Sequence, residues 1–287
     1  MTRIGWMAAL VGTAFAQFLA GNSPTPAATG AQRPDASVKA VTTAAAAYLA
    51  EYQKQLSFLL ADESYTQRVS DGGRHETESR TMTGESFLTF VPADHAWMSV
   101  HDVAVVDGRE VDDREDLQML LQRDSITGVA QLLMQRNARF NIGSITRNFN
   151  EPTLGLLVLE PLRRPQFKFD RKRVDRDGDV DVVTLAFKEI QGPTLVRGVN
   201  GTQVFSTGEL AIEAGTGRIR RSFMRLTYGS VIAQLTTQYA REAKLDLWVP
   251  AVFSERYEQT RKDLREVIVC EATYTNYRRF DVKVRIR

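Results

Sequence analysis

The second half of the chain alternates apolar and polar residues with a period of two. The alternation is clearest at residues 183–187, 210–213 and 231–239. Antiparallel strands with one face buried and one face in solvent produce this period. Turn residues such as those at 215–217 separate the segments. The pattern therefore predicts an antiparallel sheet from Gln166 to the C-terminus.

The first half combines strand and helix patterns. Strand-like segments occur at residues 65–69, 77–91 and 96–106. Ahead of them, apolar residues recur at steps of three and four from Val38 to Leu59, and Asp35 or Ser37 can cap the helix that this spacing predicts. Residues 112–140 return to helical spacing, with Asp113 and Asp124 or Ser125 as the expected caps, which predicts two short helices.

These elements predict an α+β fold in one domain, residues 36–287, with a helical insertion at about 112–160. A strongly curved antiparallel sheet of half-barrel form would bury every apolar face if the long N-terminal helix and the insertion lay on its concave side. No internal repeat and no linker between domains interrupts the pattern.

Residues 1–31 have the pattern of a cleavable signal peptide followed by a spacer. Arg3 precedes an uncharged run at 4–20, and Ala14 and Ala16 fit the small-x-small rule for cleavage before Gln17, although a cut after Ala31 is also possible. The run is short for a bilayer span, and an uncleaved anchor is the alternative. We therefore expect a periplasmic or secreted protein.

Charge and cysteine content exclude other classes. The formal net charge is +2, and removal of Arg3 with the leader leaves +1, so the field expected of a nucleic-acid-binding protein is missing. Cys270 is the only cysteine and cannot form an intrachain disulfide. Its place after residues 267–269 predicts a small buried strand residue. We expect a monomer.

No sequence motif indicates a metal site. The acidic run at 175–181 lacks the glycine and glutamate of a calcium loop at the required positions, and a hairpin turn at Asp177-Gly178 is the better interpretation. The three histidines lack a zinc-binding pattern. We therefore expect no metal and no cofactor.

Catalytic motifs are equally missing from the sequence. It contains no G-x-S-x-G, no P-loop and no G-x-G-x-x-G, so we expect a protein that is not an enzyme. An enzyme would require polar groups that converge in an interior cavity. The first candidates for such groups are His95, His101, Asp102 and Glu255.

Three C-terminal segments carry a family resemblance. They read TGELAIEAGTGR at 207–218, LWVP at 247–250 and ATYTNYRRF at 272–280. The first resembles the strand, Thr-Gly turn and strand of outer-membrane lipoprotein carriers of the LolA type, and the last is similar to the ending of related secreted bacterial proteins. The resemblance implies a half-barrel with helices on its concave face, and a role in holding lipid acyl chains in the periplasm. It places none of that family's ligand contacts on this chain.

The apolar helix face and the alternating strands together suggest an apolar groove. We expect a non-enzymatic carrier of lipid or lipoprotein acyl chains, because burial contributes about 0.8 kcal/mol per methylene. The residues expected to line the groove are Val183, Leu185, Phe187, Leu210, Ile212, Leu235 and Leu56. The alternative is a structural or regulatory module of the cell envelope with a filled core, which would bind a protein partner at a basic rim or sheet edge.

Overall fold

The computed structural model describes residues 33–56, 58–72, 74–92, 95–145, 147, 151–262 and 264–280. The signal peptide expected within residues 1–31 lies outside these ranges. Residues from Pro34 onward form a unit of their own, which is the subject of the description below. Among its described helices, none has the length and apolar character needed to cross a membrane.

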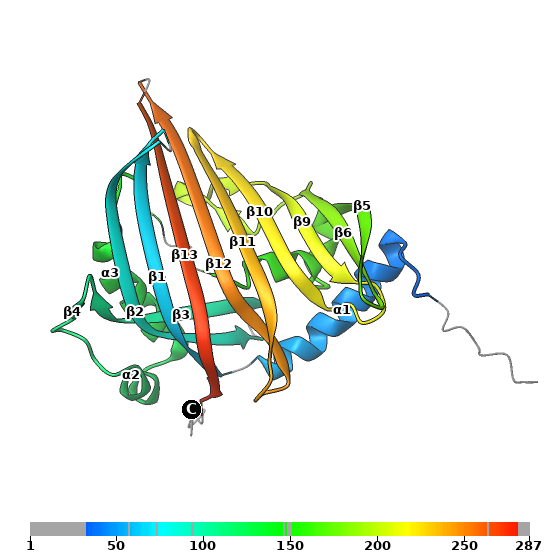
Figure 1. Cartoon of the computed structure of the whole chain (residues 1–287), viewed down its shortest axis with the longest axis horizontal. Helices are drawn as coiled ribbons and strands as arrows, with labels where there is room; N and C mark the ends of the chain where they lie inside the picture. Colours follow the sequence, from blue (N-terminus) through cyan, green and yellow to red (C-terminus); the bar gives the residue numbers. More distant parts are fainter. Residues whose placement is uncertain are drawn as a thin grey trace, which may run out of the picture. The chain divides into compact units, whose positions relative to one another are not determined.

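In the described part of the chain, eleven strands form one antiparallel sheet (Figure 1). They are β1 (Leu59–Asp71), β2 (His75–Val91), β3 (Ala96–Val106), β4 (Arg109–Glu110), β5 (Phe167–Asp177), β6 (Val180–Glu189), β9 (Ser206–Glu213), β10 (Ile219–Tyr228), β11 (Val231–Glu242), β12 (Leu247–Arg261) and β13 (Leu264–Arg279). Their order is β4-β3-β2-β1-β13-β12-β11-β10-β9-β6-β5. Two short strands, β7 (Val196–Arg197) and β8 (Gln203–Val204), pair separately.

Hairpins connect most neighbours in the sheet. The hairpin predicted at Asp177-Gly178 is confirmed, with its turn one residue later than expected: Asp177 pairs with Val180, so Gly178, with a φ of 59°, and Asp179 form the turn. At the β3–β4 turn, Asp107 and Gly108 both have positive φ angles, which a tight two-residue hairpin requires. The main exception to this local order is β13, which returns to pair with β1 and so joins the two halves of the sheet.

The N-terminal helix α1 (Val38–Gln55) begins at Ser37, whose side chain accepts a hydrogen bond from the Ala40 amide. It contacts β2, β5 and β9, and therefore crosses one face of the sheet, which we call the α1 face (Figure 1). The helix ends before Leu59, the end expected from the apolar spacing. Leu56 caps it, the positive φ of Phe58 redirects the backbone, and Leu59 already belongs to β1.

The insertion contains α2 (Leu117–Arg123), α3 (Ile126–Asn137) and three 3-10 turns, η1 (Ala138–Phe140), η2 (Leu154–Leu159) and η3 (Arg164–Gln166). Ser125 caps α3 as expected, but Asp116 caps α2. The expected cap, Asp113, pairs with Arg139 instead.

The insertion is divided between the two faces of the sheet. Apolar residues of α2 and α3 pack with Leu60, Phe87 and Val100, whereas η2 shares the main core with α1. Because neighbouring strand residues point to opposite faces, the apolar stripes of α2 and α3 pack on the face opposite α1, while another side of α3, with Gln131 and Met134, borders a cavity on the α1 face. The expectation that the whole insertion lies on one face with α1 is therefore wrong.

The predicted fold class is confirmed as α+β, with an antiparallel sheet, an N-terminal helix and a helical insertion. The main core lies on the α1 face. Its buried members include Leu49 and Tyr52 of α1, Leu157 of η2 and Tyr257 of β12. The strong curvature of the sheet stays a prediction.

Candidate functional site

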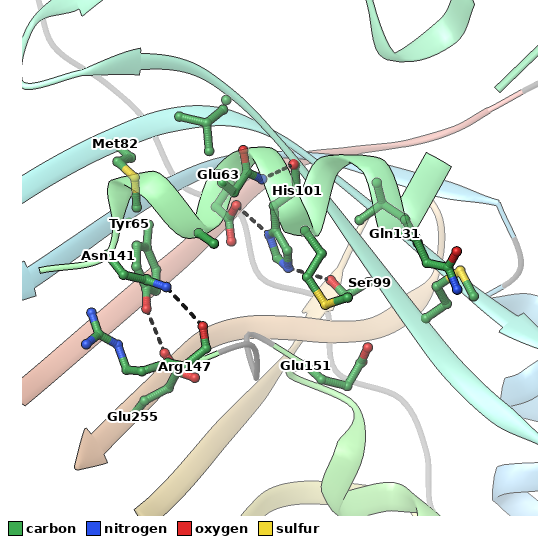
Figure 2. A pocket seen from close by; sticks show the side chains of 18 of the residues that line it. Glu63, Tyr65, Met82, Ser99, His101, Gln131, Asn141, Arg147, Glu151 and Glu255 are labelled. Carbon is green, nitrogen blue, oxygen red and sulfur yellow. Dashed lines mark hydrogen bonds and ion pairs between the residues drawn. The ribbon is translucent and has the colours of Figure 1, made fainter. Parts of the chain in front are cut away.

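A cavity of about 310 Å³ lies on the α1 face where β1, β2, β3 and β12 approach α3 (Figure 2). Its polar lining includes Glu63, Ser99, His101, Arg147, Glu151 and Glu255. Its apolar lining includes Met82, Trp97, Met98, Val103 and Met134. The cavity therefore combines a polar floor with an apolar wall.

A chain of hydrogen bonds crosses the floor from β1 to β3. Glu63 Oε2 lies 2.7 Å from His101 Nδ1, and His101 Nε2 lies 3.0 Å from Ser99 Oγ (Figure 2). Ser99 and His101 share a face of β3 because they are two residues apart. On the other side, Asn137 Nδ2 of α3 donates to the His101 carbonyl at 2.6 Å. Both ring nitrogens of His101 are thus engaged, and α3 is held against β3.

Glu255 of β12 forms the second part of the floor. It accepts hydrogen bonds from the hydroxyls of Tyr65 at 2.7 Å and Tyr257 at 2.9 Å. Burial raises the pKa of Glu255, although these two hydrogen bonds and the charges of Arg147 and His101 act in the opposite direction. Burial, followed by the nearby Glu255 charge, raises the pKa of Tyr65 well above its usual value. The phenols therefore serve as neutral donors.

Arg147 anchors the segment that follows α3. Its Nη1 donates to the carbonyls of Ile142 at 2.8 Å and Ile145 at 3.2 Å, and its Nη2 donates to Gln67 Oε1. Gln67 is fully buried on β1 and donates to the Phe140 carbonyl at 3.1 Å. These contacts tie the segment after α3 to the sheet beside the cavity.

The remaining carboxylate, Glu151, lines the cavity just before η2. Burial raises its pKa, while a hydrogen bond from the Thr153 hydroxyl and the charge of His101 lower it. The apolar wall is centred on Trp97, whose ring lies 5.1 Å from Phe90 and 5.8 Å from Tyr52 of α1. Contacts with these two rings hold the indole beside the cavity.

Three buried polar atoms on this cavity have no hydrogen-bond partner among the described residues. They are Glu63 Oε1, Trp97 Nε1 and Arg147 Nε. Buried polar groups are paired in the great majority of cases, and each exception calls for a physical reason. All three residues line the cavity, so the unpaired polar atoms are concentrated around it.

The residues predicted to line an apolar groove lie elsewhere. Val183, Leu185, Phe187, Leu210, Ile212, Leu235 and Leu56 are all buried in the main core, and none of them lines this cavity. Their contact with a ligand stays a prediction. The sequence pattern gave one unused signal for the cavity itself. Glu63 and Gln67 stand at inward positions of β1, where apolar residues would be expected.

Of the four polar residues singled out from the sequence, the structure brings His101 and Glu255 to one cavity. His95 lies at the turn before β3, with its Nδ1 3.5 Å from Glu160. Asp102 points to the other face of β3, where Arg114 Nη2 pairs with it at 2.7 Å. Within the described ranges, no group of three or more His, Cys, Asp or Glu side chains is arranged to hold a metal ion.

The connection from Glu63 through His101 to Ser99 matches that of a catalytic triad. Acyl transfer, however, develops negative charge on the carbonyl oxygen, which needs positive or hydrogen-bond-donating surroundings. Here Glu151 and Glu255 line the same cavity and would oppose that charge when ionised.

No family model and no curated relative matches this sequence. Among solved structures, an "outer membrane lipoprotein-sorting protein domain" from Vibrio parahaemolyticus shows 9% identity and a TM-score of 0.37, over 85% of this chain and 95% of that one. A DUF1329 family protein from Desulfovibrio piger shows 11% identity and a TM-score of 0.33, over 88% of this chain and 95% of that one. A chain of the Pseudomonas aeruginosa MucA/MucB complex shows 10% identity and a TM-score of 0.20, over 83% of this chain and 99% of that one. The chain is thus distantly similar in structure to these proteins, and a likeness of this degree carries no functional conclusion.

Proposed function

We propose that this chain is a non-enzymatic binding protein for an amphipathic ligand of lipid type, held in the cavity beside α3. The observation that carries the proposal is that one cavity of about 310 Å³ has both an apolar wall and a buried polar floor. Small-molecule sites begin at about this size. The cavity therefore suits one small ligand or part of one chain.

The exposure of the lining residues gives the ligand an entry route. Thr127, Gln131 and Met134 line the cavity from one side of α3, and all three are exposed. The floor is buried, with Glu63 at 8% and Glu255 at 2% exposure. A ligand would therefore enter along α3 with its polar end leading. Six methylenes buried against the wall would contribute about 5 kcal/mol.

A filled core favours the second candidate, a protein-binding module of the cell envelope. The interior between α1 and β6, β9 and β10 is occupied by side chains such as Val183 and Ile212, both with no exposed surface. That region offers binding only at its rim or edges. For either function, we propose a periplasmic or extracellular setting on the basis of the leader pattern at residues 1–31.

Ligand capture tests the first function against the second. We expect native mass spectrometry of the protein purified from its own compartment to show a bound lipid, and eight-carbon alkyl probes to bind the emptied protein. Ala130 lines the cavity on α3, so Ala130→Phe should abolish uptake. Ala50→Phe on the exposed side of α1 is the matched control and should leave uptake unchanged. Absence of both bound lipid and probe uptake would eliminate the carrier and leave the module.

A further inference from the structure

We infer that the polar end of the ligand is a cation, an alkylammonium group received by the Glu63 carboxylate. This inference rests on the proposed function and names the chemical class of ligand for the same cavity. Two independent observations carry it. One is the balance of charge on the floor, and the other is the unpartnered oxygen of Glu63.

The ionisable side chains on the cavity are unequal in sign. Glu63, Glu151 and Glu255 supply three carboxylates, and Arg147 supplies the only guanidinium among the described lining residues. The terminal nitrogens of Arg147 already donate to two backbone carbonyls and to Gln67. His101, the other basic side chain on the cavity, is bound to Glu63 and Ser99. Both basic groups are thus engaged by the protein, and the three carboxyl groups outnumber them.

The free acceptor on the floor belongs to Glu63. Its Oε2 is bound to His101, its Oε1 makes no hydrogen bond of ordinary length among the described residues, and its side chain is only 7% exposed. The carboxylate also lies near the Tyr274 hydroxyl of β13, whose pKa is raised by burial and then by the Glu63 charge. An ammonium group offers three donors and no acceptor, and a charge-assisted bond to a carboxylate is among the stronger hydrogen bonds. The unpartnered oxygen therefore matches an ammonium better than a neutral hydroxyl or an anion.

The wall has features that suit the same ligand. Trp97 lines the cavity, and the face of an indole attracts cations. Its unpartnered Nε1 can donate to an oxygen atom next to the ammonium, as in an amino alcohol. Burial raises the pKa of Glu151 and of Glu255, an effect that a neighbouring cation opposes. An anionic head such as a fatty-acid carboxylate would instead meet three carboxylates.

A headgroup series at constant chain length tests this inference by titration calorimetry at pH 7. The probes are 1-octylammonium, 1-octanol and octanoate. We expect octylammonium to bind at least tenfold more tightly than octanol, and octanoate to bind most weakly. Equal binding of octylammonium and octanol, or tightest binding of octanoate, would overturn the inference and leave the proposed function standing. If none of the three binds, the proposed function fails as well.

A variant links the preference to one side chain. Glu63→Gln should reduce octylammonium affinity at least tenfold and leave octanol affinity unchanged. Glu271→Gln, at an exposed position of β13, is the matched control and should change neither. An unchanged octylammonium preference in a folded Glu63→Gln protein would contradict the assignment to Glu63. The headgroup series on the unaltered chain decides the class of ligand even if this variant does not fold.

Discussion

Replacing Glu255 with glutamine should change how the stability of the empty protein depends on pH. Burial raises the pKa of this carboxyl above its usual value of 4.5. In the folded protein Glu255 therefore holds its proton to a higher pH than it does in the unfolded chain. Between the two pKa values the unfolded state binds fewer protons, so the free energy of unfolding falls as pH rises.

The size of this pH dependence is limited because only one proton, that of Glu255, is involved. A single group contributes a slope of at most about 1.4 kcal/mol per pH unit between its unfolded and folded pKa values. Glu255→Gln removes that slope. It also leaves one of the two tyrosine hydroxyls, Tyr65 or Tyr257, opposite an amide nitrogen that cannot accept its hydrogen bond. This second loss costs about 1–3 kcal/mol and is independent of pH.

Urea unfolding of both proteins from pH 3 to pH 8 separates the two terms. The difference in unfolding free energy, unaltered protein minus Glu255→Gln, should be constant below pH 4.5 and should decrease as pH rises above it. Glu271→Gln, at an exposed site on β13, is the matched control for the loss of one carboxylate. A Glu255→Gln difference that is flat, or that increases with pH, would show that the folded protein does not raise the pKa of Glu255.

Three further predictions concern the scaffold. Leu49→Ala should lower the free energy of unfolding in urea by about 2–5 kcal/mol, since this fully buried α1 side chain would leave a cavity; a loss below 1 kcal/mol would contradict the packing. Gly217→Ala should lower the melting temperature by at least about 4 °C, because Gly217 has a φ of 71° and a Cβ there would lie 2.2 Å from the Ala44 carbonyl oxygen. Burial raises the pKa of Cys270 to about 12, so a thiol reagent at pH 8 should label it only in urea.

Most strands were predictable because apolar and polar residues alternate along a strand that has one buried face. On β11, buried and less buried residues alternate from Ala233 to Tyr239, and the sequence shows this alternation without any knowledge of a partner. The order of the strands was not predictable, since periodicity describes a face and not a neighbour. The placement of β13 between β1 and β12 depends on pairings such as Tyr65 with Ala272, across a long stretch of sequence.

The cavity was only partly predictable for a related reason. His101 and Glu255 could be singled out by residue type, but their meeting depends on how β3 and β12 lie in the sheet. Arg147 gave no periodic signal because it stands outside the helices and strands. The side of the sheet that α2 and α3 cover also could not be read from their amphipathic spacing, which reveals an apolar stripe but not the surface it meets.

The two ends of the α1 face differ in a way that stability alone does not explain. Toward β6 and β9, apolar side chains such as Leu185 and Leu210 fill the space below α1. Toward β1 and β3, the same face carries Glu63 and His101, and it surrounds a cavity. Replacing buried ionic groups with apolar ones of similar volume is often neutral or stabilising. The stability of the fold therefore does not require these ionic groups. The polar floor is held in shape by β1, β3, β12 and α3 while some of its atoms stay unpaired, which is the preorganisation that the proposed binding function requires.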